Sequence, residues 1–347
     1  MELMPKPDSC AGCPYYDNWQ KDGYIPGSGP TAIGTPMIVG EGGGEQEEIQ
    51  AKGFVGGSGR VLRKWLHEAN LNPNDFRYNN VVSCRPPGNE DPAPSAVEHC
   101  RANLERELSM VRPNLVITVG DFALNWFTGR KKITMVMGYV FPFRDTKVLA
   151  LAHPAMVMYL KNSPRGKNIW AMQVAYLRKV PQLLSIRGWT PPPEPFIEEP
   201  TLADVRMLGD MLNQMEEPEV IFDVENPPDV RRRQAKLLIV GLGIPGKLYI
   251  SINMNPRSWV DWEYEEMVSI VGGILASPKV LKTGHNLPHD VEVSIYNGFE
   301  VNGPFFDTIL AHHVTYGEMR HALGIIAPLY TLREYWKDQG HSAHEEK

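Results

Sequence analysis

The nine residues PMIVGEGGG, Pro36–Gly44, decide the fold of the first half of this chain. An apolar run of strand length ends in an acid and three glycines, which is the pattern of a strand that enters a tight turn. Apolar residues at helical spacing follow in GRVLRKWLHEA (59–69), and a second strand is expected in RYNNVVS (77–83). This alternation continues through NLVITVG (114–120) to KVLALAHP (147–154). It predicts an α/β fold with a parallel sheet that is covered by helices.

Three polar side chains fall at or near the ends of these predicted strands. They are Glu41, Asn80 and His153. The loops at the carboxyl ends of parallel strands build the active site in such sheets, so these three residues are expected to meet at one edge. Between them the sequence predicts a helix from Ser95 to Val111, with Ser95 as its cap.

The stretch GWTPPPEPFIEEP (188–200) reads as a stiff, extended linker because it holds three consecutive prolines and no periodic apolar pattern. The expected domains are therefore 1–187 and 201–347. In the second, EVIFDVEN (219–226), LLIVGLGI (237–244) and KLYISINM (247–254) read as three successive strands. A helix over about 262–276, the strand KVLKTGH (279–285) and a helix that opens at Asp290 follow. This order is that of a ribonuclease-H-like fold, by analogy.

Composition gives broad limits. The chain has 347 residues, of which 42% are hydrophobic and 22% charged, as in ordinary globular proteins. We find neither a signal peptide nor an apolar run long enough to span a membrane, so we expect a cytoplasmic protein in a reducing compartment. The net charge of −6 hides a basic first half and an acidic second half. These fit one region that touches polyanions and another that gathers carboxylates, or simply two solvated surfaces.

The four cysteines suggest one metal site. Cys10 and Cys13 form a Cys-x2-Cys pair, and Cys84 and Cys100 flank a Pro- and Gly-rich stretch. In a reducing compartment, metal ligation is favoured over disulfides. Four thiolates select zinc or an iron–sulfur cluster, and their spacing leaves both open.

Four motifs surround these cysteines in a fixed order. They are VGEGGGEQEE (39–48), KGFVGGSGRVL (52–62), NNVVSCRPPGNEDP (79–92) and LAHPAM (151–156). Together with the cysteine placement, this order resembles the family 4 uracil-DNA glycosylases, the iron–sulfur type, over roughly residues 8–180. The resemblance implies a glycosylase fold, a DNA substrate that contains uracil, and a [4Fe-4S] cluster on the four cysteines.

The resemblance also implies roles for single residues. Glu41 would polarise the attacking water or stabilise the oxocarbenium-like sugar. Phe54 would stack on the flipped uracil, and Asn80 would hydrogen-bond its edge and exclude cytosine. His153 would donate to the carbonyl oxygen that gains charge as the uracil anion leaves. The remaining implied substrate-binding residues are Gly42 and Glu47.

Several positions depart from the pattern of that family. Gly43 stands where the family usually has Pro, and Ser83 replaces a common Lys. The expected Arg-Gly after the third strand is Met137-Gly138 here, and Ala155-Met156 follow His-Pro. Loss of cationic contacts would weaken DNA binding or change base preference.

A second constellation lies beyond the linker. Asp223 and Glu225 share one face of a strand, since side chains alternate. Asn286 and Asp290 follow in an N-x3-D pattern, and Asp307 stands in F-D-T. This resembles the DEDD-type 3′–5′ exonucleases, particularly those of family A DNA polymerases. The resemblance implies divalent metal ions, Mg²⁺ or Mn²⁺, on Asp223, Glu225 and Asp290, with Asp307 supporting the fold. The alternative is a solvated acidic strand end.

The third exonuclease motif is missing from the sequence. Tyr330 and Glu334 have a similar spacing but lie too early, and His341 and His344 are expected to be solvated. Either the chain is the front part of a longer polypeptide such as a replicative polymerase, or the nuclease is inactive and serves as a binding module.

The sequence therefore predicts a uracil-excising enzyme that acts on DNA and carries an exonuclease-like domain. A polymerase domain or subunit is the expected protein partner. One alternative is a non-catalytic DNA-binding module that senses uracil in a template. Another is a scaffold that zinc stabilises.

Overall fold

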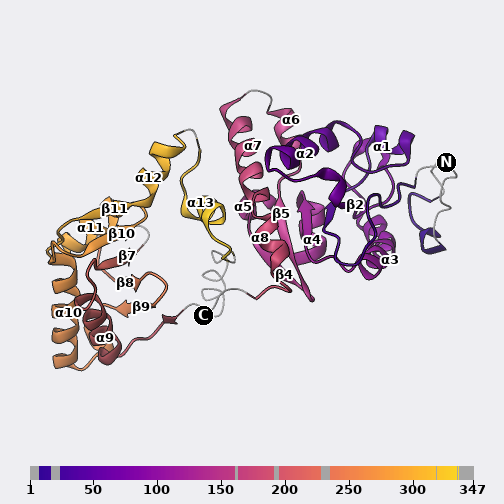
Figure 1. Ribbon diagram of the computed structural model, residues 1–347. Helices are drawn as coiled ribbons and strands as arrows, with labels where there is room; N and C mark the ends of the chain where they lie inside the picture. The colour runs from indigo at the N-terminus through magenta and orange to yellow at the C-terminus, as the bar shows by residue number, and fades with distance from the viewer. Residues whose placement is uncertain are drawn as a thin grey trace. The chain divides into compact units, whose positions relative to one another are not determined.

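The computed structural model describes residues 8–16, 24–160, 163–190, 195–227, 235–317, 319–333 and 335. The chain forms two compact units, and each is an α/β structure (Figure 1). Unit 1 comprises Met1–Pro191 with Glu318–Lys347, and unit 2 comprises Pro192–Gly317. Within these described ranges, no helix is long and apolar enough to cross a membrane.

Unit 1 is built on a five-stranded sheet of order β2-β1-β3-β5-β4. All neighbours pair in parallel except β4 and β5, which are antiparallel. The strands are β1 (Met37–Gly40), β2 (Arg77–Asn80), β3 (Val116–Val119), β4 (Val140–Phe143) and β5 (Thr146–Leu151). The predicted α/β class and parallel sheet are confirmed.

Strands β1, β3 and β5 are buried on both faces, which explains their largely apolar sequences. Along β1, Met37 and Val39 pack in one core cluster and Ile38 packs in the other. The helices that cover the sheet (Figure 1) are α2 (Gly57–Glu68), α3 (Pro94–Val111), α4 (Asp121–Thr128), α5 (Ile133–Val136), α7 (Pro164–Leu177) and α8 (Val180–Ser185). Shorter elements are η1 (Asp8–Cys10), α1 (Glu45–Gln50), η2 (Pro73–Asp75), η3 (Pro87–Asn89) and α6 (Ala155–Tyr159).

The start of α3 differs from the predicted one. The helix begins at Pro94, its N-cap residue is Ala93, and no side chain caps it. Proline suits the first helical turn because that position needs no backbone donor. The expectation that Ser95 caps this helix was therefore wrong.

Unit 2 contains a six-stranded sheet of order β11-β10-β7-β8-β9-β6. The strands are β6 (Phe196–Ile197), β7 (Glu219–Glu225), β8 (Ile239–Ile244), β9 (Leu248–Asn253), β10 (Leu281–Gly284) and β11 (Phe305–Asp307). Three consecutive strands, β7 to β9, are antiparallel, and β10 and β11 join β7 in parallel on its other side. This is the ribonuclease-H-like order that the sequence predicts.

The helices of unit 2 are α9 (Leu202–Asn213), α10 (Asp261–Ala276), α11 (Leu287–Tyr296) and α12 (Thr308–Thr315), with the short η5 (Pro256–Ser258) before α10. Helix α11 begins three residues before the predicted opening at Asp290, with Pro288 in its first turn. The Asp307 carboxylate accepts from the backbone N–H groups of Asn286 and Leu287, both at 3.1 Å. This distant cap, which local sequence does not reveal, sets the earlier start.

The chain returns to unit 1 after Gly317. The sequence predicts one domain over 201–347, whereas the described residues that follow Gly317 pack on unit 1. Helix α13 (Leu323–Tyr330) contacts α5 and α7. The Tyr139 hydroxyl donates to the Gly324 carbonyl at 3.0 Å, and the Lys179 Nζ donates to the Thr331 carbonyl at 2.9 Å.

The packing of α13 on unit 1 can be tested at Ile326, which is buried. We expect Ile326→Ala to destabilise unit 1 by about 2–5 kcal/mol, the usual cost of such a buried truncation. The shift of the unit 1 transition in a calorimetric unfolding experiment would measure it. Leu310→Ala on α12 is the matched control, because Leu310 is 58% exposed and its loss should cost under about 0.5 kcal/mol. An unchanged unit 1 transition in Ile326→Ala would contradict the packing of α13.

Candidate active site

The carboxyl edge of the unit 1 sheet gathers the predicted polar residues. Glu41 directly follows β1, Asn80 ends β2, and His153 lies two residues beyond β5. The sheet order runs outward in opposite directions from β1 and β3, so a topological switch point lies between them, where α/β sheets bind ligands. A Cβ on Gly120, just after β3, would lie 3.2 Å from the Cβ of His153. The β3 and β5 ends therefore meet closely.

Phe54 and Asn80 converge on Gly40, the last residue of β1. A Cβ on Gly40 would lie 2.6 Å from Asn80 Oδ1 and 2.9 Å from Phe54 Cζ. Phe54 has a φ of 59°, which is costly for a bulky residue. Gly59 permits this turn, because a Cβ there would lie 1.9 Å from the Phe54 carbonyl oxygen. The strained backbone presents an aromatic ring beside an amide, which suits recognition of a flat polar ring.

Glu47 joins the two glycine-rich loops of this site. Its carboxylate is buried and accepts from the backbone N–H groups of Gly56 at 2.6 Å and Gly44 at 3.2 Å. One loop leads from Glu41 and the other follows Phe54. Both carboxylate oxygens of Glu47 accept hydrogen bonds from the backbone, one in each loop. Glu47 therefore holds the two loops together.

The imidazole of His153 is set up as a hydrogen-bond donor. Burial lowers its pKa, so the ring is neutral near neutral pH. The backbone N–H of Ala155 donates to Nδ1 at 3.3 Å, which leaves the proton of the neutral ring on Nε2. A neutral donor can stabilise a developing anion without itself needing to titrate.

The carboxyl group of Glu41 lies in an acidic environment. Burial, then the charges of Asp91 and Asp121, raises the pKa of Glu41 to about 7. Sequence reasoning missed both acids: Asp121 lies two residues beyond β3, as His153 does beyond β5, whereas Asp91 lies in the loop before α3. Asp121 also accepts from the backbone N–H of Ile133 at 2.6 Å, which fixes its position at the start of α4.

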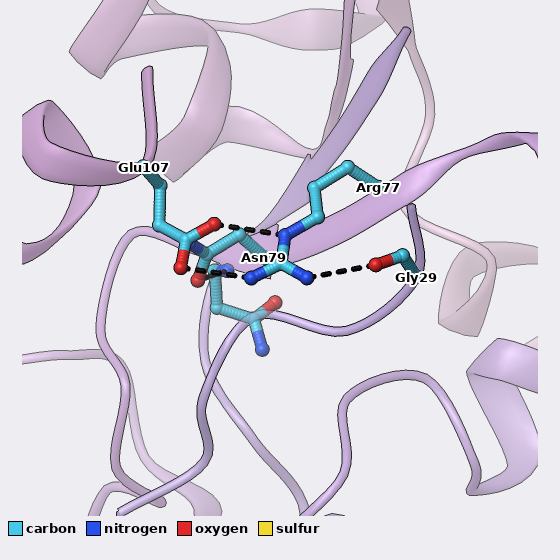
Figure 2. A network of polar contacts seen from close by, with 5 residues as sticks. Gly29, Arg77, Asn79 and Glu107 are labelled. Atoms are coloured by element: carbon cyan, nitrogen blue, oxygen red, sulfur yellow. Dashed lines mark hydrogen bonds and ion pairs between the residues drawn. The ribbon is translucent and has the colours of Figure 1, made fainter. Parts of the chain in front are cut away.

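An ion pair anchors the strand that carries Asn80 (Figure 2). Arg77 donates twice to the Glu107 carboxylate on α3, at 2.8 and 2.9 Å, and once to the Gly29 carbonyl at 2.9 Å. Asn79 accepts from the Asn80 backbone N–H at 2.8 Å. These contacts lock the backbone that presents the Asn80 side chain.

Two departures from the family pattern have local explanations. A Cβ at Gly43 would lie 2.0 Å from Ile25 Cδ1, so the Pro usual at this position would need Ile25 to move. Met137 packs against both cores of unit 1, and its Sδ accepts from Gln173 Nε2 at 3.4 Å. Gln173 Oε1 in turn accepts from the Ala152 backbone N–H at 2.9 Å, next to His153.

The four cysteines gather at one side of unit 1. All are buried, and none forms a disulfide. Cys13, Cys84 and Cys100 share one core cluster, and the Asn103 amide lies 3.9 Å from the Cys10 Sγ and 4.0 Å from the Cys100 Sγ. Among the described residues, no three His, Cys, Asp or Glu side chains are grouped to hold one metal ion.

Three carboxylates approach one another in unit 2. Burial and then the Glu225 charge raise the pKa of Asp223 to about 6, although Asp223 keeps considerable exposure on its strand face. Burial and then the Asp223 charge raise the pKa of Asp290 to about 7. Asp290 Oδ1 also accepts from the Val224 backbone N–H at 3.0 Å, which ties α11 to β7. A bound cation would relieve the repulsion between these carboxylates.

The other predicted residues of the second constellation are placed as follows. Asp307 caps backbone N–H groups, including that of Ile309 at 2.8 Å, and so holds β11, α11 and α12 together. Asn286 adopts a φ of 70° just before α11. Tyr330 lies on α13, which belongs to unit 1. Glu334, His341 and His344 lie outside the described residues.

The sequence matches the model of the uracil DNA glycosylase superfamily over residues 27–177. Over this part the chain belongs to the uracil-DNA glycosylases, in their type-4 family. The type-4 uracil-DNA glycosylase of Archaeoglobus fulgidus is 34% identical over 160 residues, which cover 44% of this chain and 79% of that protein. The Thermotoga maritima type-4 enzyme is 32% identical over 154 residues, or 43% of this chain and 78% of that protein.

A DNA polymerase of Bacillus phage SP01 is 26% identical over 123 residues, which cover 35% of this chain but 13% of the polymerase. Among solved structures, Brucella melitensis NrnC bound to pGG is 16% identical with a TM-score of 0.31, and the match covers 41% of this chain and 63% of NrnC. This TM-score is low, and the fold assigned to unit 2 rests on its own strand order.

Proposed function

We propose that unit 1 excises uracil from DNA by hydrolysis of the N-glycosidic bond. The observation that carries this proposal is the convergence of the Phe54 ring and the Asn80 amide on Gly40, with the neutral His153 at the adjoining strand end. A flipped base needs an aromatic surface, an amide that reads its edge and a donor for the departing anion. Membership of the type-4 family supports the same reaction.

Each residue then has a defined part in the reaction. Phe54 supports the flipped base, and the Asn80 amide hydrogen-bonds to its edge. Nε2–H of His153 donates to the carbonyl oxygen that gathers charge as the bond to the sugar breaks. Ionised Glu41 stabilises the positive charge on the sugar and orients the water that attacks it. Glu47 fixes the two loops from which Glu41 and Phe54 project.

We propose that Cys10, Cys13, Cys84 and Cys100 hold a [4Fe-4S] cluster. Four buried thiols without a disulfide form the donor set for such a cluster, and an amide donor lies against two of the sulfurs. Zinc is the other metal that four thiolates select, and membership of the type-4 family supports the cluster. The cluster would tie the N-terminal segment to the loop between Asn80 and α3.

The experiment is incubation of the protein with single-stranded DNA that contains one uracil, followed by heating in alkali. Strand breaks at the uracil are expected, and the same DNA with cytosine should remain intact. Binding of the uracil DNA in a mobility-shift assay without any abasic product would refute excision and support the alternative, a module that senses template uracil.

We infer that unit 2 derives from a DEDD-type 3′–5′ exonuclease, on the strength of its strand order and the approach of Asp223 to Asp290. With Glu225 these carboxylates would hold Mg²⁺ or Mn²⁺. DNA is the proposed partner of both units, and a polymerase domain or subunit is the proposed protein partner. The reduced cysteines suit an intracellular compartment.

This chain is expected not to trim DNA from its 3′ end in Mg²⁺ or Mn²⁺. The third exonuclease motif has no match in the sequence, and a two-metal site with a missing carboxylate loses the geometry for in-line attack. A 5′-labelled single strand on a denaturing gel gives the readout, with an active exonuclease as positive control. Ladder formation that Asp223→Asn abolishes would show that another side chain supplies the fourth ligand.

A further inference from the structure

One face of α3 carries a ladder of three side chains that leads to the cysteines. Cys100, Asn103 and Arg106 follow at intervals of three residues, so they lie one above the other on the helix. Arg106 Nη2 donates to Asn103 Oδ1 at 2.6 Å. Asn103 Nδ2 faces the sulfurs of Cys100 at 4.0 Å and Cys10 at 3.9 Å. The ladder thus joins two distant segments of the thiol site.

The guanidinium of Arg106 fixes which way the Asn103 amide points. A guanidinium is only a donor, so the amide oxygen must face it and the NH₂ group must face the thiols. Asn103 is only 4% exposed, so water cannot easily take over either role.

We infer that Asn103, oriented by Arg106, is a positioning residue that donates N–H···S hydrogen bonds to Cys10 and Cys100 and tunes the iron–sulfur cluster. This inference rests on the proposed cluster. Four thiolates give the loaded site a net negative charge, and donors to the sulfurs stabilise its more reduced state. The same bonds fasten the N-terminal Cys10 segment to α3, which slows opening of the site.

The test replaces Asn103 by Leu, which has nearly the same shape and no donor. Two properties of the purified, cluster-loaded protein are measured: its reduction potential by film voltammetry, and the rate at which its visible absorbance disappears with a chelator and oxygen. Asn103→Leu should lower the potential and lose its cluster roughly tenfold faster. Arg106→Met, which keeps Asn103 but frees its amide to turn, should change both properties in the same direction by less.

Arg101→Met is the matched control on α3, since Arg101 is exposed and pairs with Glu98. It should leave both properties at the wild-type values. If Asn103→Leu fails to load, Arg106→Met alone decides the matter. Wild-type potential and decay rate in a loaded Asn103→Leu or Arg106→Met protein would overturn the inference and leave the cluster and uracil excision standing. Wild-type protein that holds zinc and no iron would overturn it together with the cluster.

Discussion

Replacement of His153 by Ala is expected to slow uracil excision roughly 10²- to 10³-fold, the usual effect of removing one donor to a developing anion. The structure supplies the reason, because the Ala155 N–H group occupies Nδ1 and leaves Nε2–H as the donor. The loss should appear in the single-turnover rate constant for excision, with DNA binding little changed.

Two comparisons sharpen this expectation. His67→Ala is the matched control, because His67 is an exposed residue in the last turn of α2. It should keep the wild-type excision rate. Burial lowers the pKa of His153, so its ring is neutral in the free protein and does not set the dependence of the rate on pH. The activity that remains in His153→Ala should therefore show the same pH dependence as the wild type. Wild-type excision rates in His153→Ala would refute the donor role.

The second large effect is expected at Glu41. Replacement by Gln should slow excision by roughly 10²-fold, the lower end of the range of positioned acid–base groups, because a neutral amide cannot balance the charge on the sugar. Since burial and the charges of Asp91 and Asp121 raise the pKa of Glu41 to about 7, the wild-type rate should rise with pH through about 7 and level off above it. Single-turnover rates from pH 5.5 to about 9 measure this limb.

Neutral replacements of the two acidic neighbours test the cause. Asp91→Asn and Asp121→Asn should each lower the pKa of Glu41 and move the acid limb to lower pH, while Asp145→Asn, in the exposed turn between β4 and β5, should leave it in place. An acid limb that does not move in Asp91→Asn or Asp121→Asn would show that it belongs to another group.

The same pKa has a consequence for stability. The folded protein holds the Glu41 proton more tightly than the unfolded chain, whose carboxyl titrates near 4.5. The stabilisation is therefore complete below pH about 4.5 and is lost as the pH rises to about 7. Glu41→Gln should be less active but more stable than the wild type at pH 8, as thermal unfolding would show. Equal stability of the two proteins at pH 8 would contradict the raised pKa.

Much of the fold could be predicted from local patterns. The run Pro36–Gly44 and the alternating elements after it predict the parallel sheet, because the central strands, buried on both faces, have largely apolar sequences. The three successive strands β7 to β9 of unit 2 were equally clear. The first residues of the helices were harder to predict. Asp307 caps α11 from about twenty residues away, and α3 begins at Pro94 without a side-chain cap. A cap from a distant element leaves no trace in the neighbouring sequence.

The sequence by itself determined which chemical groups are present and in what order. It placed Glu41, Asn80 and His153 at strand ends, paired the cysteines two and two, and put Asp223 and Glu225 on one strand face. These properties follow from the periods of strands and helices, which are local, and from motifs whose residues are consecutive.

Only the tertiary structure decided how these groups behave. The raised pKa of Glu41 comes from its burial and then from the charges of Asp91 and Asp121, and the amide of Asn103 faces the thiols of two separate segments. The described residues after Gly317 join unit 1, because their apolar side chains, such as Met319 and Leu329, pack in its core. Charge coupling, amide orientation and burial depend on distances between residues remote in sequence, and folding alone sets those distances.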